Sequence, residues 1–129
     1  MSSFAPLRYL TFDYSEDDHG HGTFDAMASV TPHQAALVQA EMAAVLTWAE
    51  CEFAGVRAPL DDGGDWDAEA QAVQEVATPL ALAYDTAHRQ WHTRPGTPGV
   101  PRLTYTLTIT GTAAFCDALR ERFALDADT

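Results

Sequence analysis

Three stretches of the chain alternate between apolar and polar residues with a period of two, which predicts β-strands. The plainest is residues 102–110, RLTYTLTIT, in which the apolar side chains face one way and four threonines face the other. Residues 23–30, TFDAMASV, alternate in the same way, and residues 7–14, LRYLTFDY, are rich in the aromatic residues that strands favour. We therefore expect strands at these three places, each with one buried face.

A period near 3.6 replaces this alternation in two other stretches and predicts helices. Residues 35–53 follow the start signal TPHQ, in which Thr31 caps the helix and Gln34 completes a capping box by bonding back to the Thr31 amide. The apolar stripe of this helix consists of Val38, Met42, Val45, Ala49 and Phe53. A second helix is predicted over residues 113–125, with Thr112 as its cap.

Residues 66–77, WDAEAQAVQEVA, fit both periods. Their alanine, glutamate and glutamine content favours a helix, whereas their alternation fits a strand, and the choice stays open. We expect short strands at residues 80–85 and 89–94, because the strand at 102–110 would otherwise have few partners. The prolines and glycines of PGTPGVP, residues 95–101, predict a loop.

The order of these elements predicts an α+β fold. We expect a two-layer sandwich in which two main helices pack on one face of a mostly antiparallel sheet, in the order β-β-α-β(β)β-α. The length of 129 residues is sufficient for one domain with a hydrophobic core, so a single domain is predicted over residues 1–129, with an internal loop at 95–101. Residues 126–129 are expected to be frayed.

The charge balance narrows the classes of partner. Nineteen acidic residues against seven arginines, with no lysine, give a net charge of −12. Phosphate backbones and anionic lipid surfaces attract cations, so this excess argues against binding to nucleic acid or to a membrane. It favours a protein partner of basic character, and a homodimer is a further alternative.

Nothing in the sequence predicts export or membrane insertion. The N-terminal MSSFAPLRYL lacks a basic region followed by an apolar run, and no apolar run reaches the roughly 20 residues of a membrane span. Cys51 and Cys116 are far apart and form no CxxC pair. We therefore expect a cytoplasmic protein with reduced thiols.

The stretch SEDDHGHGTFD, residues 15–25, holds the densest group of candidate metal ligands. Asp17, His19 and His21 carry carboxylate and imidazole groups, which bind zinc and other divalent ions. The simpler interpretation is a hairpin turn between two strands, because aspartate and glycine tolerate the backbone angles of turns. The metal prediction therefore depends on whether a third ligand comes close in space.

His88 and His92 form a second histidine pair, in HRQWH. The glutamate that follows the first histidine in zinc-protease helices is missing. In an extended strand the two side chains would point the same way at about 13 Å, which is too far for one ion. We expect them to contribute to a metal site only if they meet His19 and His21.

The remaining candidates are binding residues. Trp66 lies between two acids and is the aromatic side chain that we expect to be an exposed anchor. The acidic loop around it adds Asp61, Asp62, Asp65 and Asp67, whose spacing does not match a calcium-binding loop. The sequence contains no GxSxG, GxGxxG or P-loop motif, and we predict no catalytic residue.

Together, these features favour a small acidic binding or regulatory module without a catalytic site or cofactor. One concrete version is an inhibitor or immunity-type protein that presents carboxylates to a basic partner. The alternative is a hydrolase that depends on zinc or another divalent metal held by the loop at residues 17–21. Cys116 stands in the first turn of a predicted helix, where a helix dipole can lower the pKa of a thiol, but we expect a small core residue there.

Overall fold

The computed structural model describes residues 7–125, so the predicted fraying of residues 126–129 lies outside the described residues. The main sheet has four strands in the order β1-β2-β6-β3, with every neighbouring pair antiparallel, and β4 and β5 form a second sheet. The strands are β1 (Thr11–Glu16), β2 (Gly22–Val30), β3 (Trp66–Glu75), β4 (Leu80–Asp85), β5 (Gln90–Pro95) and β6 (Arg102–Gly111). The helices are α1 (Pro32–Glu52), the short 3-10 helix η1 (Leu60–Asp62) and α2 (Ala113–Phe123).

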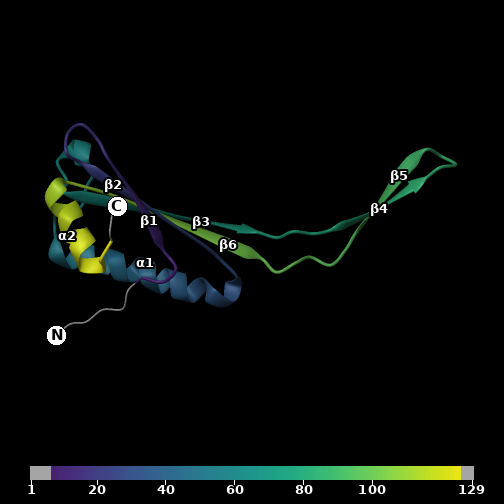
Figure 1. Cartoon of the computed structure of the whole chain (residues 1–129), viewed down its shortest axis with the longest axis horizontal. Coiled ribbons are helices and arrows are strands. Elements are labelled where there is room, and N and C mark those ends of the chain that lie inside the picture. The colour runs from purple at the N-terminus through teal and green to yellow at the C-terminus, as the bar shows by residue number, and fades with distance from the viewer. Residues whose placement is uncertain (1–6, 126–129) are drawn as a thin grey trace.

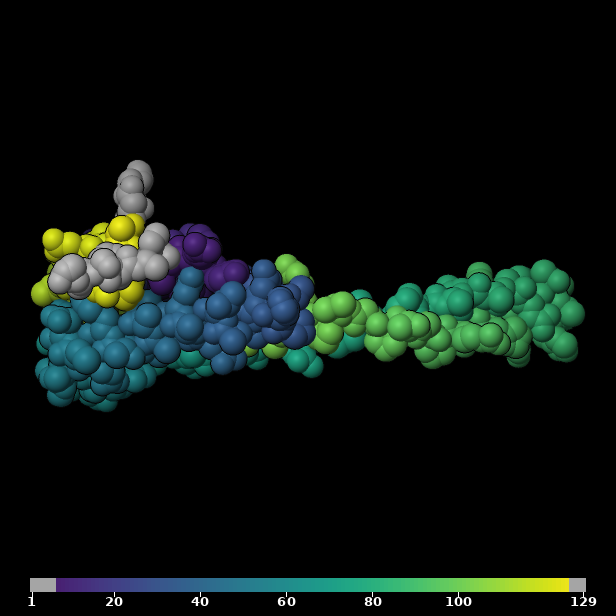
Figure 2. Space-filling model, turned by 90° about the horizontal axis from the view of Figure 1, so that it is seen from below, coloured from purple at the N-terminus to yellow at the C-terminus, as the bar shows by residue number. Residues whose placement is uncertain are grey.

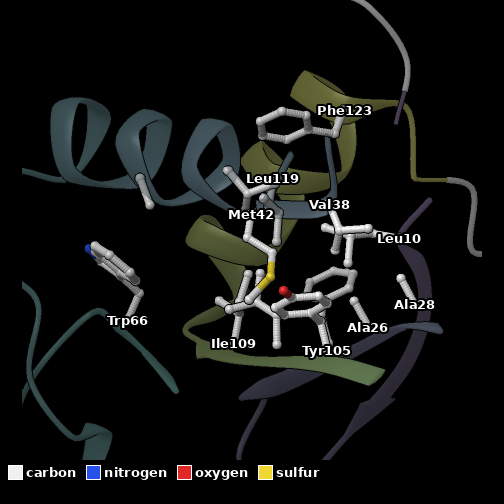
Figure 3. Close-up of a cluster of buried hydrophobic side chains, with 14 of the residues drawn as sticks. Leu10, Ala26, Ala28, Val38, Met42, Trp66, Tyr105, Ile109, Leu119 and Phe123 are labelled. Carbon is white, nitrogen blue, oxygen red and sulfur yellow. The ribbon is translucent and has the colours of Figure 1, made fainter. Parts of the chain in front are cut away.

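Helices α1 and α2 pack on one face of the four-stranded sheet, which confirms the predicted α+β two-layer sandwich (Figure 1). One hydrophobic core lies between the two layers (Figure 3). Its largest fully buried side chains include Trp66, Phe24, Phe115, Leu107, Ile109 and Leu119. From α1 the core receives Val38, Met42, Val45 and Ala49, which are four members of the predicted stripe. Neither of these described helices is long and apolar enough to cross a membrane.

The two helices begin in different ways. The Thr112 hydroxyl oxygen accepts a hydrogen bond from the Phe115 N–H at 3.4 Å, so its predicted role as a cap is confirmed. At α1, the Thr31 hydroxyl donates to the side-chain oxygen of Gln34 at 3.5 Å instead of capping a backbone amide. The reciprocal capping box predicted there is therefore wrong, and Pro32 at the first helical position fixes the backbone in its place.

Residues 7–10 are held against α1 and do not extend β1. The carboxylate of Glu41 accepts hydrogen bonds from the N–H groups of Arg8 at 2.6 Å, Tyr9 at 3.1 Å and Leu10 at 3.1 Å. Hydrogen bonds to a charged acceptor are stronger than neutral ones, so this contact fixes the segment to the helix. The strand predicted from residue 7 therefore begins only at Thr11.

Two glycines that face each other in the sheet, Gly22 and Gly111, allow α2 to approach closely. A Cβ atom on Gly22 would lie 2.8 Å from the sulfur of Cys116, and one on Gly111 would overlap the ring of Phe115. Phe115 in turn stacks on Trp66, with ring centroids 5.5 Å apart and ring planes 2° apart. The first turn of α2 therefore sits directly on the sheet.

Residues 66–77, whose pattern fitted the period of a helix and that of a strand, form a strand over Trp66–Glu75. Each residue from Trp66 to Glu75 pairs with a residue of β6, and this pairing decides between the two periods. The short strands expected at residues 80–85 and 89–94 are confirmed as β4 and β5, of which β5 begins one residue later than predicted.

Beyond the four-stranded sheet, the chain forms a long projection (Figures 1 and 2). We call residues 76–101 the arm and the remaining described residues the body. The N–H of Gly96 donates to the Pro79 carbonyl oxygen and that of Gly99 donates to the Ala77 carbonyl oxygen, both at 2.8 Å. The two sides of the arm are therefore joined even along the predicted proline and glycine loop, and the arm ends in the β4–β5 hairpin.

Candidate interaction surface

The hairpin at the end of the arm has one apolar face and one polar face. Strands β4 and β5 pair antiparallel, so side chains of directly opposite residues, such as Tyr84 and Trp91, lie on the same face. The apolar face of the arm consists of Leu80, Leu82, Tyr84, Trp91, Thr93 and Pro95. The polar face of the arm consists of Ala81, Ala83, Asp85, Gln90, His92 and Arg94.

The apolar face of the arm is open to solvent. The exposed fractions of its large side chains are 56% for Leu80, 62% for Leu82, 49% for Tyr84 and 64% for Trp91. An isolated two-stranded hairpin is at best marginally stable in water. Large apolar side chains gathered on one exposed surface are typical of interaction sites.

The arm and the rest of the chain carry opposite net charge. Within the arm, Arg89 and Arg94 against Asp85 give a net charge of +1. The whole chain carries −12, which leaves −13 for the residues outside the arm. His88 and His92 add two imidazole groups to the arm. The acidic composition of the chain predicted a basic partner, and the arm of this chain is itself positively charged.

Asp85 organises the turn at the end of the arm. Its Oδ1 accepts hydrogen bonds from the N–H groups of Ala87 at 3.0 Å and His88 at 3.2 Å. Its Oδ2 lies 2.8 Å from Nδ1 of His88 and 3.5 Å from Nε2 of His92. These contacts, first of all the one with the His88 side chain, lower the pKa of Asp85 below its usual 3.8. His88 lies in the turn and not in a strand, so the spacing given for an extended strand does not apply to this pair.

The interpretation of the stretch at residues 15–25 as a hairpin turn is confirmed, since its residues 17–21 join β1 to β2. Oδ1 of Asp17 accepts hydrogen bonds from the N–H groups of His19 at 2.8 Å and His21 at 2.9 Å. These bonds, with the one from His21 the larger cause, lower the pKa of the Asp17 carboxyl. Figure 1 places this turn and the arm at opposite ends of the molecule, so the two histidine pairs do not meet. Within the described part of the chain, no three His, Cys, Asp or Glu side chains are grouped to hold a metal ion.

Trp66 is fully buried, so the prediction of an exposed anchor at this position is wrong. Its indole Nε1–H donates to the Phe53 carbonyl oxygen at 3.4 Å, and its ring packs on Phe115. The acids on either side of it misled the prediction, because neighbouring residues of a strand point to opposite faces. The exposed tryptophan is Trp91, in the arm.

Of the four acidic candidates near Trp66, Asp67 has a structural contact. Its Oδ1 accepts a hydrogen bond from Nε of Arg57 at 3.2 Å, and the same guanidinium donates to Glu50 at 3.2 Å. The bond with Asp67 is the larger cause of the raised pKa of Arg57. Asp61 and Asp62 lie in η1 and are exposed. Asp65 lies just before β3 and is half-buried.

A shallow apolar groove of about 380 Å³ runs between α1 and β3 on the helix side of the sheet. Its apolar lining includes Met42, Ala43, Leu46, Ala70, Ala72 and Tyr105. In the order of the main sheet β3 is an edge strand. The outer side of its first residues is occupied, since the Ala58 N–H donates to the Trp66 carbonyl oxygen and Arg57 donates to that of Ala68. From Ala70 onward, beside the groove, the outer side of β3 is open to a further strand. The sequence pattern did not reveal this groove, because its two walls are far apart in the chain.

No protein-family model matches this chain, and no curated protein or solved structure matches it either. The surfaces of the arm and the body are therefore the basis for a proposal about function.

Proposed function

We propose that this protein is an interaction module that binds a protein partner through the apolar face of its arm. The observation that carries the proposal is the exposure of four large apolar side chains on one face of a projecting hairpin. Burial of one such side chain contributes about 1.5–3 kcal/mol. Tryptophan and tyrosine, both present on this face, are enriched among the residues that dominate binding energy.

The acidic body adds an electrostatic component to this proposal. A net charge of −13 outside the arm would steer a basic partner towards the body and raise the rate of association. The proposal thus assigns two surfaces to the expected binding or regulatory module with a basic protein partner: the apolar face of the arm and the acidic body. The apolar face would determine affinity, and the charge would determine association rate and salt dependence.

The alternative of a metal-dependent hydrolase gains no support from the β1–β2 turn. Asp17 is engaged by backbone N–H groups of its own turn, and the histidines of the arm are at the other end of the molecule. The binding module is therefore the function for which the described residues provide an argument.

Replacement of three apolar residues of the arm by threonine tests the proposal. The variant Leu82→Thr/Tyr84→Thr/Trp91→Thr removes the apolar side chains but keeps the β propensity of the strands. A matched control, Ala81→Thr/Ala83→Thr/His92→Thr, changes three residues of the polar face. Tagged wild-type and variant proteins are used to recover partners from extracts of the source cells, at low and raised salt.

We expect the apolar-face variant to bind at least about tenfold more weakly, since a loss of 1.4 kcal/mol already weakens binding tenfold. The polar-face control should retain its partner at low salt. Circular dichroism of both variants checks that the body still folds. Equal recovery of partners by the two variants would contradict the proposal.

A further inference from the structure

We infer that the partner of the arm is a second copy of this chain. In this arrangement the apolar face of one arm docks in the α1–β3 groove of another copy, beside the free edge of β3. This inference rests on the proposed function and names the partner. The arm points away from its own body in both views, so its hairpin does not reach the groove of the same copy (Figures 1 and 2).

The helix side of the groove provides an apolar counterpart to the arm. Its floor is formed by Ala70 and Ala72 of β3, whose short side chains leave the groove open. Its wall is formed by Ala43 and Leu46 of α1. Large apolar side chains such as Trp91 would fill this space and lose their contact with water, which stabilises the complex in proportion to the area buried.

The free edge of β3 provides a backbone counterpart. An extended strand that pairs with an open sheet edge continues the sheet, and its main-chain hydrogen bonds contribute affinity. Because side chains alternate along a strand, one face of the added hairpin would lie on the helix side and the other on the outer side of the sheet. The apolar face would then meet the groove while the polar face lies beside the outer face of β3.

The charges agree with this placement on the outer side of the sheet. Glu69 pairs with Thr108 of β6, and its side chain points to the outer face of the sheet, opposite to the side chains of Ala70 and Ala72. The polar face of the arm carries Arg94, which would approach the carboxylate of Glu69 on the edge strand. Arm and body have net charges of opposite sign, whereas two arms have the same sign, so contact between arm and body is favoured over contact between two arms.

Arm and groove are different surfaces, so each junction joins the arm of one copy to the groove of another. Two copies can exchange arms, or several copies can close a ring, through the same junction. Sedimentation velocity measures the outcome as multiples of the 14.0 kDa chain. Both kinds of assembly support the inference, because both require one arm and one groove at each junction.

Two variants each remove one side of the junction. The arm variant, Leu82→Thr/Trp91→Thr, removes large apolar side chains from the hairpin. The groove variant, Ala43→Arg, places a large cation at an exposed position of α1 that lines the groove. Its matched control is Ala44→Arg, since the next residue of the helix is also exposed and lies outside the groove lining. We expect wild type and Ala44→Arg to assemble, and both junction variants to remain monomeric.

A mixture of the two junction variants tests the arrangement itself. The arm variant keeps an intact groove, and the Ala43→Arg variant keeps an intact arm. We therefore expect the mixture to form a complex that neither variant forms alone. If the contact instead joined two arms, Ala43→Arg alone would still assemble and the mixture would gain nothing, and either result overturns the inference.

Failure of the inference can be told apart from failure of the proposed function. A wild-type chain that stays monomeric overturns self-association. The proposed function is still supported in that case if the wild type recovers a different protein and the threonine triple variant does not. Assembly that is unchanged in the arm variant overturns the inference as well. If the threonine triple variant recovers the same partners as the wild type, the proposed function is overturned.

Discussion

Tyr84 and Trp91 face each other across the hairpin of the arm, with ring centroids 5.1 Å apart and ring planes at 56°. Trp91 is 64% exposed, whereas Trp66 is fully buried. In a monomeric background such as Ala43→Arg, we expect acrylamide to quench the fluorescence of Trp91 much more strongly than that of Trp66. The substitution Trp91→Phe should remove most of the easily quenched emission, and Trp66→Phe should not. A protected Trp91 in the monomer would contradict the exposed hairpin.

Truncation of the buried tryptophan should destabilise the body severely. Trp66 stacks on Phe115 and is fully buried, so Trp66→Ala leaves a large cavity. We expect a loss of about 3–5 kcal/mol in the free energy of unfolding. The same truncation at Trp91 should change it by no more than about 0.5 kcal/mol, as for other exposed sites. Urea unfolding at low protein concentration checks both, because assembly would add stability that depends on concentration.

Glu41 should contribute to stability through the segment that precedes β1. Its carboxylate accepts hydrogen bonds from three successive backbone N–H groups, those of residues 8–10. We expect Glu41→Ala to cost about 1–3 kcal/mol, because partly buried donors lose a charged acceptor. Glu52→Ala, at an exposed site on the last residue of α1, is the matched control. Equal unfolding midpoints for the two variants would show that the contact contributes nothing.

The two cysteines should differ sharply in reactivity. Cys116 is buried, which confirms the expected small core residue, and loss of hydration raises the pKa of its thiol above the usual 9.0. Cys51 is exposed. We expect iodoacetamide at neutral pH to modify Cys51 in the folded protein and to reach Cys116 only after unfolding. Mass spectrometry of the modified peptides measures this, and rapid native labelling of Cys116 would disprove the burial.

The two hairpin turns should weaken in acid. Hydrogen bonds hold the pKa of Asp17 and of Asp85 below the usual 3.8. A carboxyl whose pKa is lower in the folded than in the unfolded state contributes its full stabilisation above 3.8 and loses it as the pH falls through the folded value. NMR titration should therefore give both carboxyl groups midpoints below 3.8. In Asp85→Asn the turn of the arm should lose its dependence on pH in this range, while the β1–β2 turn keeps its own.

Periodicity alone was sufficient where one face of an element is plainly apolar. The buried residues of α1, from Val38 to Ala49, follow a single helical stripe. In β6 the buried residues alternate with threonines, so its strand and its inner face could be predicted together. The turn at residues 15–25 was predicted from the same kind of local information, because turn chemistry depends on the backbone angles of a few neighbouring residues.

Residues 66–75 could not be assigned in this way, because alanine fits the period of a helix and that of a strand. Pairing with β6 determined that these residues form a strand. Trp66, which was predicted to lie at the surface, pairs with Gly111 and is the largest fully buried side chain. This contact depends on a glycine 45 positions away in the chain, which no local pattern contains.

What the sequence by itself determined is therefore the period of each clear element, the turns between them and the acidic charge. Only the tertiary structure decided which apolar side chains are covered. Leu82 and Trp91 are residue types that are typical of a core strand, but they lie on a projecting hairpin. Trp66 stands between two acidic residues in the sequence, and its side chain is fully buried. The physical reason is that burial depends on which distant segments pack against a residue, whereas periodicity reports only the direction in which its side chain points.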